Sequence, residues 1–124
     1  MRIVIVEDEE ILLKILVEKF QQEKFEVFSA INGEEAILVT KKVNPDIVVL
    51  DIILPKKDGF EVLKELKSDA NLKQIPVLVL SNLSQDEEIK KALSLGAIDY
   101  FVKTQHPIKE IAAKVKELIT KCGA

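Results

Sequence analysis

The stretch Ile47-Val48-Val49-Leu50-Asp51 decides the fold, because four consecutive apolar residues end in a single acid. A short apolar run of this kind, rich in β-branched residues, is typical of a strand that is covered on both faces, as in parallel sheets. Similar runs occupy residues 3–6, 25–30, 76–80 and 98–102. A segment with helical periodicity follows each run. The sequence therefore predicts strands that alternate with helices.

The clearest helix follows the last run. Its apolar residues recur every three or four positions and share one face: Ile108, Ile111, Ala112, Val115, Leu118 and Ile119. Pro107 is expected at the first helical position, where its missing N–H costs nothing. Residues 11–20 and 60–66 form two further stripes. Residues 84–87, Ser-Gln-Asp-Glu, have the spacing of a capping box and predict a helix start there.

Strict alternation of strand and helix implies parallel strands, joined by right-handed crossovers, with helices on both faces of the sheet. The expected fold class is α/β. The second run contains Glu26 and Ser29 and the fifth contains Asp99, so these two strands are expected at the sheet edges. No repeat, low-complexity stretch or long linker divides the chain. We expect one domain over residues 1–124, without an output domain.

Polar residues follow four of the predicted strands. Glu7-Asp8-Glu9 follows the first run, and the others are Asp51, Ser81 and Lys103. Ligands of open parallel sheets bind beyond the carboxyl ends of the strands, so these side chains are expected to converge. Clustered carboxylates suit Mg²⁺, which prefers hard oxygen ligands. Asp51 could then attack a phosphoryl donor, while Lys103 and Ser81 contact the transferred oxygens.

Composition limits the partners and the cellular location. The formal net charge is -3 and no basic run occurs, which argues against direct binding of nucleic acid. The apolar stretches are far shorter than the roughly 20 residues that span a bilayer, and no secretory signal is present, so we expect no membrane insertion and a cytoplasmic protein. Cys122 has no partner for a disulfide and is interpreted as a tail thiol without function.

Four motifs now resemble those of response-regulator receiver domains. They are Ile3 to Glu9, Asp51 to Gly59, Val79-Leu80-Ser81 and Asp99 to Lys103, in the same order as in that family. The resemblance covers essentially the whole chain. It implies a flavodoxin-like fold with five helices, doubly wound around a five-stranded parallel sheet of strand order 2-1-3-4-5.

The resemblance also implies a metal site. Asp51 corresponds to the phosphoacceptor and to one ligand of Mg²⁺. Asp8 corresponds to a direct ligand, Glu7 to a ligand acting through water, and Ile53 to a ligand acting through its backbone carbonyl. The function that the resemblance implies is the Mg²⁺-dependent transfer of a phosphoryl group from a phosphohistidine to Asp51.

Three further residues correspond to the phosphate-binding and switch positions of the family. Lys103 would pair with the phosphate, Ser81 would be the switch hydroxyl, and Tyr100 would turn inward when Ser81 moves. The face of the fourth helix, fifth strand and fifth helix would then change. Implied partners are a sensor histidine kinase or a histidine phosphotransfer protein, and an unknown downstream protein. Such a protein is not an enzyme beyond its own phosphorylation and dephosphorylation.

Several departures keep alternatives open. Thr104 stands where most family members have a proline joined through a cis peptide, so either strain or a rerouted loop is expected after Lys103. Glu7 replaces a commoner aspartate, and Asn82 is bulkier than the residue usual beside the switch hydroxyl. Tyr100 fits edge packing as well as switching. A degenerate receiver that binds proteins without phosphorylation is therefore one alternative.

A phosphohydrolase of the haloacid dehalogenase type is a second alternative, because it also uses an aspartate at a strand end. That chemistry needs a second acid two residues after the nucleophile, to protonate the leaving group. Ile53 occupies this position. The sequence therefore disfavours this enzyme.

Overall fold

A parallel sheet of five strands forms the centre of the computed structural model, which describes residues 1–121. The strand order is β2-β1-β3-β4-β5. Both the α/β class and the edge positions predicted for the second and fifth strands are confirmed. Cys122 lies outside the described residues. The strands are β1 Arg2–Val6, β2 Glu26–Ala30, β3 Ile47–Leu50, β4 Val77–Ser81 and β5 Asp99–Val102.

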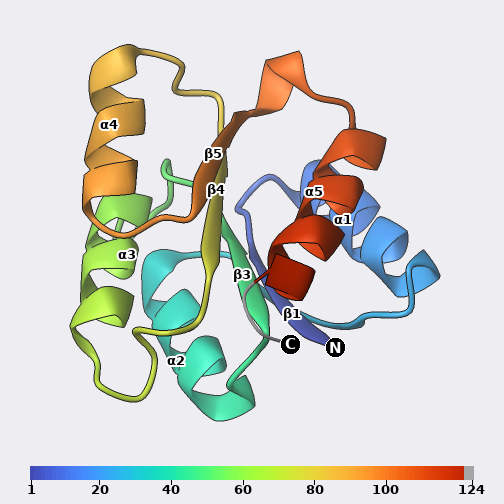
Figure 1. Ribbon diagram of the computed structural model, residues 1–124, viewed down its shortest axis with the longest axis horizontal. Helices are drawn as coiled ribbons and strands as arrows, with labels where there is room; N and C mark the ends of the chain where they lie inside the picture. Colours follow the sequence, from blue (N-terminus) through green and yellow to red (C-terminus); the bar gives the residue numbers. More distant parts are fainter. Residues whose placement is uncertain (122–124) are drawn as a thin grey trace.

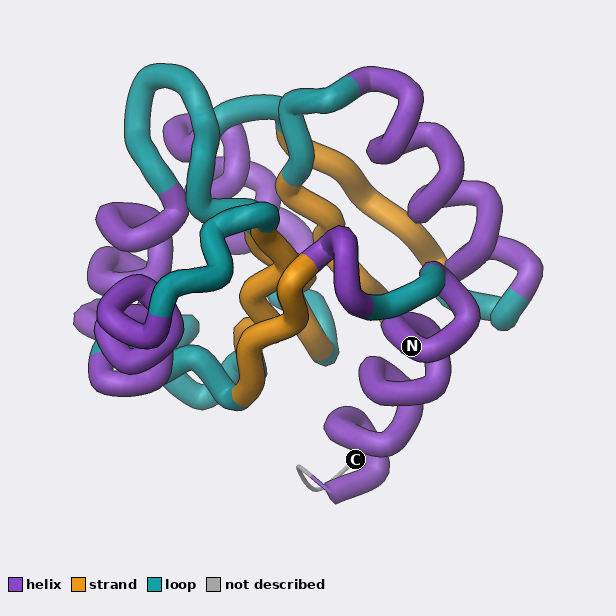
Figure 2. The backbone as a smooth tube through the Cα atoms, turned by 90° about the horizontal axis from the view of Figure 1, so that it is seen from above, coloured by secondary structure: helices purple, strands orange, loops and turns teal. Residues whose placement is uncertain are grey.

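Helices cover both faces of this sheet (Figures 1 and 2). In Figure 1, α2, α3 and α4 lie on one side of the strands, and α1 and α5 lie on the other. No helix within residues 1–121 is long and apolar enough to cross a bilayer. The helices are α1 Glu10–Gln22, α2 Gly33–Val43, α3 Gly59–Ser68, α4 Asp86–Ser94, α5 Ile108–Lys121 and the short 3-10 helix η1 Lys103–Gln105.

The central strands divide the core into two halves, because successive side chains of a strand point to opposite faces. On β1, Val4 and Val6 pack with residues of α2, α3 and α4. Ile3 and Ile5, on the other face, pack with residues of α1 and α5. Each such side chain contributes about 2 kcal/mol when fully buried. The unbroken apolar runs of the sequence therefore follow from burial on both faces.

Strand register brings the acids to one level of the sheet. Val6 pairs with Leu50, so that Glu7 and Asp51 both follow directly. The Asp51 amide donates to the Val6 carbonyl over 3.1 Å, and the Glu7 amide donates to the Ala30 carbonyl over 3.0 Å. These bonds continue the ladder one residue beyond the strands. Both acidic side chains are thereby fixed at the carboxyl edge of β1 and β3.

Two local predictions are resolved by the structure. The capping box at residues 84–87 is wrong, because the N-cap of α4 is Gln85 and makes no side-chain cap hydrogen bond. After β5, the chain turns into η1, and the peptide bond between Lys103 and Thr104 is trans, as all peptide bonds of residues 1–121 are. Of the two outcomes expected after Lys103, the rerouted loop is therefore the one that occurs.

Candidate functional site

Three carboxylates meet at the carboxyl edge of β1 and β3. Glu7, Asp8 and Asp51 each offer an oxygen, and these oxygens all lie within 4.8 Å of one another. Glu7 is 1% exposed and Asp51 is 4% exposed, whereas Asp8 is open to solvent. Acids this close repel one another unless a cation lies between them. The geometry therefore fits a cation site with one accessible side.

Lys103 supplies positive charge to this cluster. Its Nζ lies 2.7 Å from Glu7 Oε1 and 2.9 Å from Asp51 Oδ2. The lysine is the first residue of η1, so the end of β5 delivers it across β4 to the acids. Its side chain is only 9% exposed. The structure thus brings Lys103 together with Glu7 and Asp51, as the sequence predicts.

Backbone amides orient the remaining carboxylate oxygens. Asp51 Oδ1 accepts hydrogen bonds from the amides of Ile52, over 2.7 Å, and Ile53, over 3.3 Å. Glu7 Oε2 accepts one from the Glu9 amide over 3.1 Å. Each buried acid therefore has one oxygen on the backbone and one on Lys103. Hydrogen bonds from both directions fix the rotamers of these acids.

Burial and the hydrogen bonds between these groups shift their pKa values in opposite directions. Burial raises the pKa of Glu7 to about 6, partly offset by the hydrogen bond from Lys103, and the neighbouring Asp51 raises it further. Burial also disfavours the charged form of Lys103, but its hydrogen bonds to Glu7 and Asp51 outweigh this effect and raise its pKa. Lys103 is therefore a permanent cation at neutral pH.

Ser81, the last residue of β4, and Tyr100, in the neighbouring strand β5, both contact Leu83. Ser81 is fully buried, and its Oγ accepts a hydrogen bond from the Leu83 amide over 3.4 Å. The Tyr100 hydroxyl donates to the Leu83 carbonyl over 2.7 Å. Tyr100 is 9% exposed, and burial raises the pKa of its hydroxyl. The ring therefore points inward and packs with the core between the sheet and α4.

A pocket of about 140 Å³ opens above Asp51. It is lined by Asp8, Glu9, Asp51, Ile53, Asn82 and Lys103. The sequence assigns no role to Glu9 or Asn82, although Glu9 belongs to the acidic run after the first strand and Asn82 stands beside the switch hydroxyl. Asn82 directly follows the last residue of β4, and Glu9 lies three residues after the last residue of β1; this placement is the signal for both. The pocket has room for a small group, and it is open to Asp51.

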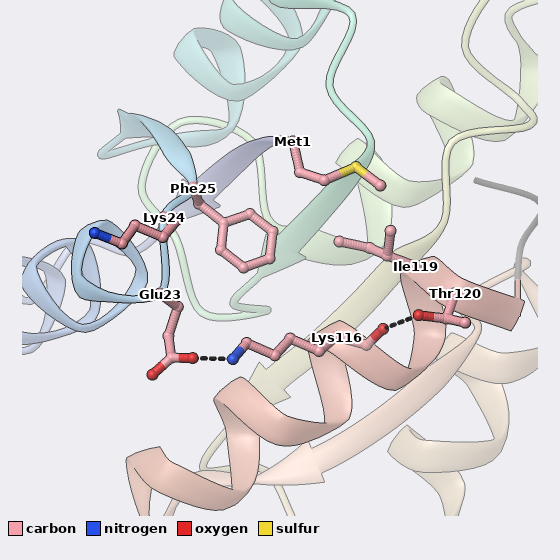
Figure 3. A pocket seen from close by; sticks show the side chains of 7 residues that line it. All are labelled: Met1, Glu23, Lys24, Phe25, Lys116, Ile119 and Thr120. Carbon is pink, nitrogen blue, oxygen red and sulfur yellow. Dashed lines mark hydrogen bonds and ion pairs between the residues drawn. The ribbon is translucent and has the colours of Figure 1, made fainter.

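A larger cavity of about 410 Å³ lies near the opposite end of the sheet (Figure 3). Phe25 and Ile119 give it an apolar wall, and an ion pair between Glu23 and Lys116 crosses it. The Thr120 hydroxyl is bonded to the Lys116 carbonyl over 3.0 Å. Two charged residues that line the cavity, Glu23 and Lys116, pair with each other, and the cavity contains none of the clustered acids. The pocket above Asp51 is therefore the better candidate for chemistry, although it is smaller.

Comparison with known proteins identifies the family of the chain. The chain matches the family model of the response regulator receiver domain over residues 3–116. It is 37% identical over 122 residues to the alkaline phosphatase synthesis transcriptional regulatory protein PhoP of Bacillus subtilis (strain 168), covering 97% of this chain and 49% of that protein. The chain spans about half the length of the curated relatives it matches.

Two solved structures extend the comparison. The BeF3-activated receiver domain of Klebsiella pneumoniae RstA has a TM-score of 0.88 and 28% identity, covering 96% of this chain and 98% of that one. The Mn²⁺-bound form of response regulator Rcp1 has a TM-score of 0.77 and 27% identity, covering 98% of this chain and 88% of that one. Since the family model matches most of the chain, including all three clustered acids, the chain belongs to the family of response regulator receiver domains of two-component signalling.

Proposed function

We propose that this receiver domain accepts a phosphoryl group on Asp51 from a phosphohistidine donor, with Mg²⁺ as cofactor. The observation that carries the proposal is the placement of Asp51 at the base of the small pocket, between two further acids and the ammonium of Lys103. Buried ionisable groups whose pKa values are shifted by burial and by specific charged neighbours, as for Glu7 and Lys103, mark candidate functional sites. The role of the protein would be signal transfer, with no catalysis beyond its own phosphorylation and dephosphorylation.

Residues of the acid cluster fit a magnesium ion. Their carboxylate oxygens are hard ligands within 4.8 Å of one another, and Asp8 faces solvent, from which the ion would enter. Asp8 and Asp51 would bind it directly, Glu7 through water, and Ile53 through its backbone carbonyl. When bound, Mg²⁺ supplies charge that compensates the phosphoryl oxygens. The Mn²⁺ in Rcp1, a structure of similar fold, supports a divalent cation here.

The transfer itself needs no general base, because an ionised carboxylate is already a nucleophile. An oxygen of Asp51 forms a bond to phosphorus while the P–N bond to the donor histidine breaks. The electron pair of that bond stays on the imidazole nitrogen, which then takes up a proton from solvent. Lys103, 2.9 Å from Asp51, is positioned to neutralise an oxygen of the arriving group.

Ser81 and Tyr100 are proposed to report the phosphoryl group to the surface. Both hydrogen-bond to Leu83, in the loop between β4 and α4. If the Ser81 hydroxyl turned to the phosphoryl group, its bond from the Leu83 amide would be lost, and this loop would have to adjust. Tyr100 is tied to the carbonyl of the same residue. The face of α4, β5 and α5 would therefore change with phosphorylation.

The proposed partners follow from this chemistry. A sensor histidine kinase or a histidine phosphotransfer protein would donate the phosphoryl group in the cytoplasm, and a downstream protein would bind the changed face. PhoP is by its name a transcriptional regulatory protein, about twice as long as this chain. The formal net charge of -3 favours a protein partner over direct contact of this domain with nucleic acid.

Intact-mass analysis tests the proposal. Incubation with Mg²⁺ and a small phosphodonor such as acetyl phosphate should add one phosphoryl group to the protein and none to Asp51→Asn. Asp46→Asn is a matched control, because Asp46 is an exposed acid that directly precedes the first residue of β3, whereas Asp51 directly follows the last. It should be phosphorylated like the wild type. Equal mass gain in Asp51→Asn would contradict the assignment.

Magnesium titration separates the proposal from the degenerate-receiver alternative. A phosphoryl acceptor should bind Mg²⁺, and its phosphorylation should stop when the metal is chelated. A protein that binds partners without phosphorylation needs neither property. Steady turnover of a phosphoester would instead favour the dehalogenase-type hydrolase, although Ile53 stands where that enzyme needs its second acid.

A further inference from the structure

The loop between β3 and α3, residues 51–58, carries both Asp51 and Ile53. It is a compact turn. The Lys57 amide donates to the Pro55 carbonyl over 2.8 Å, and Lys56 has a positive φ of 68°. The Gly59 amide donates to the Ile52 carbonyl over 2.7 Å and closes the loop at its far end. Whatever holds this turn also holds the backbone carbonyl of Ile53 relative to Asp51.

Gly33, the first residue of α2, contacts this loop from another part of the chain. It is buried, and its amide donates to the Pro55 carbonyl over 3.4 Å. A Cβ at Gly33 would overlap the Lys57 carbonyl oxygen and would lie 2.6 Å from both the carbonyl carbon and the Cβ of Lys57. Because backbone atoms stand in the way, no side-chain rotation could relieve this overlap. Glycine is required here for space.

The start of α2 is itself held firmly. The Asn32 side chain accepts a hydrogen bond from the Glu35 amide over 2.8 Å, and Glu35 Oε1 accepts one from the Ile31 amide over 3.3 Å. Ala36, Ile37 and Val43 anchor the helix in the core. A side chain at Gly33 would therefore displace the exposed loop more readily than the helix.

We propose that Gly33 is a positioning residue for the metal site. Because it has no side chain, residues 55–57 can lie directly against the start of α2, and this contact sets the position of Ile53 relative to Asp51 and Asp8. This inference rests on the proposed function of the site. Gly33 lies outside all four receiver-like motifs of the sequence and touches no acid of the cluster. Its effect on the metal passes entirely through the backbone of the loop.

Gly33→Ala tests this role by Mg²⁺ titration followed in NMR spectra. The added Cβ should weaken Mg²⁺ affinity by about tenfold or more, as loss of groups that orient metal ligands does. Phosphorylation at saturating Mg²⁺ should fall less than phosphorylation at limiting Mg²⁺. A folded Gly33→Ala protein with wild-type Mg²⁺ affinity overturns the inference. If the wild type itself binds no Mg²⁺, the proposed function fails, and the inference fails with it.

Gly96→Ala is the matched control. Gly96 has a φ of 109°, and a Cβ added there would lie 2.9 Å from the Lys67 side chain. Gly96 itself is remote in sequence from the loop of residues 51–58. This variant should lose stability through backbone strain and keep its Mg²⁺ affinity. If it weakened Mg²⁺ binding as much as Gly33→Ala, the effect would be general destabilisation, and the inference would be overturned.

A measurement on the wild type decides the question if Gly33→Ala does not fold. Coupling between two sites is reciprocal, so Mg²⁺ binding should alter the Gly33 amide if Gly33 positions the loop. The expected result is slower hydrogen exchange at the Gly33 amide, with a change of its chemical shift, on addition of Mg²⁺. A Gly33 amide that does not respond, while the Ile53 amide does, overturns the inference.

Discussion

The ammonium group of Lys103 forms ion pairs with two acids, Glu7 and Asp51. Its Nζ lies within 3 Å of oxygens of both Glu7 and Asp51, and all three side chains are nearly buried. Burying charges is expensive unless they are paired and hydrogen-bonded. One cation between two anions still leaves net negative charge, which favours a further cation at this edge of the sheet.

Glu7 gives the metal-free protein a pH-dependent stability. Because its pKa is about 6 in the folded protein and 4.5 ordinarily, the folded state binds more protons than the unfolded chain between these values. The free energy of unfolding should therefore fall as the pH rises through this window, by about 2 kcal/mol at most. Glu7→Gln should lose this fall. Urea denaturation of both proteins in chelator, below pH 4.5 and above pH 6, measures the difference. A difference in stability between the two proteins that is the same at both pH values contradicts the prediction.

The phosphoryl group on Asp51 should hydrolyse slowly. Ile53 lines the pocket, and Leu83 follows Ser81 by two positions, but neither offers a polar group to orient an attacking water. Ile53→Asn should shorten the half-life about fivefold, corresponding to one hydrogen bond of about 1 kcal/mol. Decay of the phosphorylated mass measures it. Leu38→Asn, at another exposed apolar position, should decay like the wild type. A half-life of seconds in the wild type would rule out this view.

The sequence was informative about which residues lie at the site, but not about all of their contacts. Asp51, Glu7, Ser81 and Lys103 could be named because each stands at the end of an apolar strand, and parallel strands end at one edge. The double contact of Lys103 could not be predicted, since it depends on the turn into η1 and on two distant strands. The close approach of Gly33 to the 51–58 loop depends likewise on how α2 packs, and no local pattern encodes it.

Among the α-helices, α4 has the fewest buried residues. Its N-cap Gln85 makes no side-chain cap hydrogen bond, and Ala92 is its one buried residue, although Ile89 packs partly against the core. Helices with few buried contacts open more readily than others. The helix nearest the proposed switch residues is therefore held least firmly.

Adding a cap should stabilise α4. Gln85 already has the extended backbone of an N-cap, with φ -77° and ψ 146°, so Gln85→Ser can form the missing bond without strain. The expected gain is about 1 kcal/mol. Slower hydrogen exchange of the α4 amides and a higher urea midpoint would show it. Gln74→Ser, in an exposed turn, should change neither. Unchanged exchange in α4 would show that the cap does not form.

Element positions were more predictable than element ends. Polar residues at Glu26 and Asp99 correctly marked the two edge strands, because edge strands meet solvent. The capping spacing at residues 84–87 failed because a cap depends on where the preceding loop leaves the sheet, and that is set by tertiary contacts. Asp58, by contrast, does cap α3, accepting from the Glu61 amide over 2.9 Å.

Magnesium should stabilise the whole molecule, because a ligand that binds only the folded state shifts the folding equilibrium. At a Mg²⁺ concentration one hundred times its Kd, the gain should be about 2.7 kcal/mol. Asp8→Ala should lose most of this gain. Glu18→Ala, which also removes an exposed acid, should keep it. Thermal unfolding with and without Mg²⁺ tests both. A gain that Asp8→Ala retains in full would remove Asp8 from the metal site.

At the scale of the molecule, the sequence predicted alternation and the edge strands from its own pattern. The full order β2-β1-β3-β4-β5 came from resemblance, because apolar runs do not say which of two buried strands is the neighbour of a third. The two core halves follow from that order. They explain why residues 3–6, 47–50 and 77–80 are apolar without a break.

The cavity in Figure 3 brings the beginning of the chain next to the end of α5, since Met1 lines it together with Ile119 and Thr120. A short flexible linker could join these ends, and new ones could be opened in the turn of residues 69–76 between α3 and β4. Chain ends that lie close together tolerate such circular permutation. The permuted protein would keep β1, β3 and their acids uncut. Receptor or reporter proteins could then be fused to the new chain ends, at the edge of the sheet opposite to Asp51.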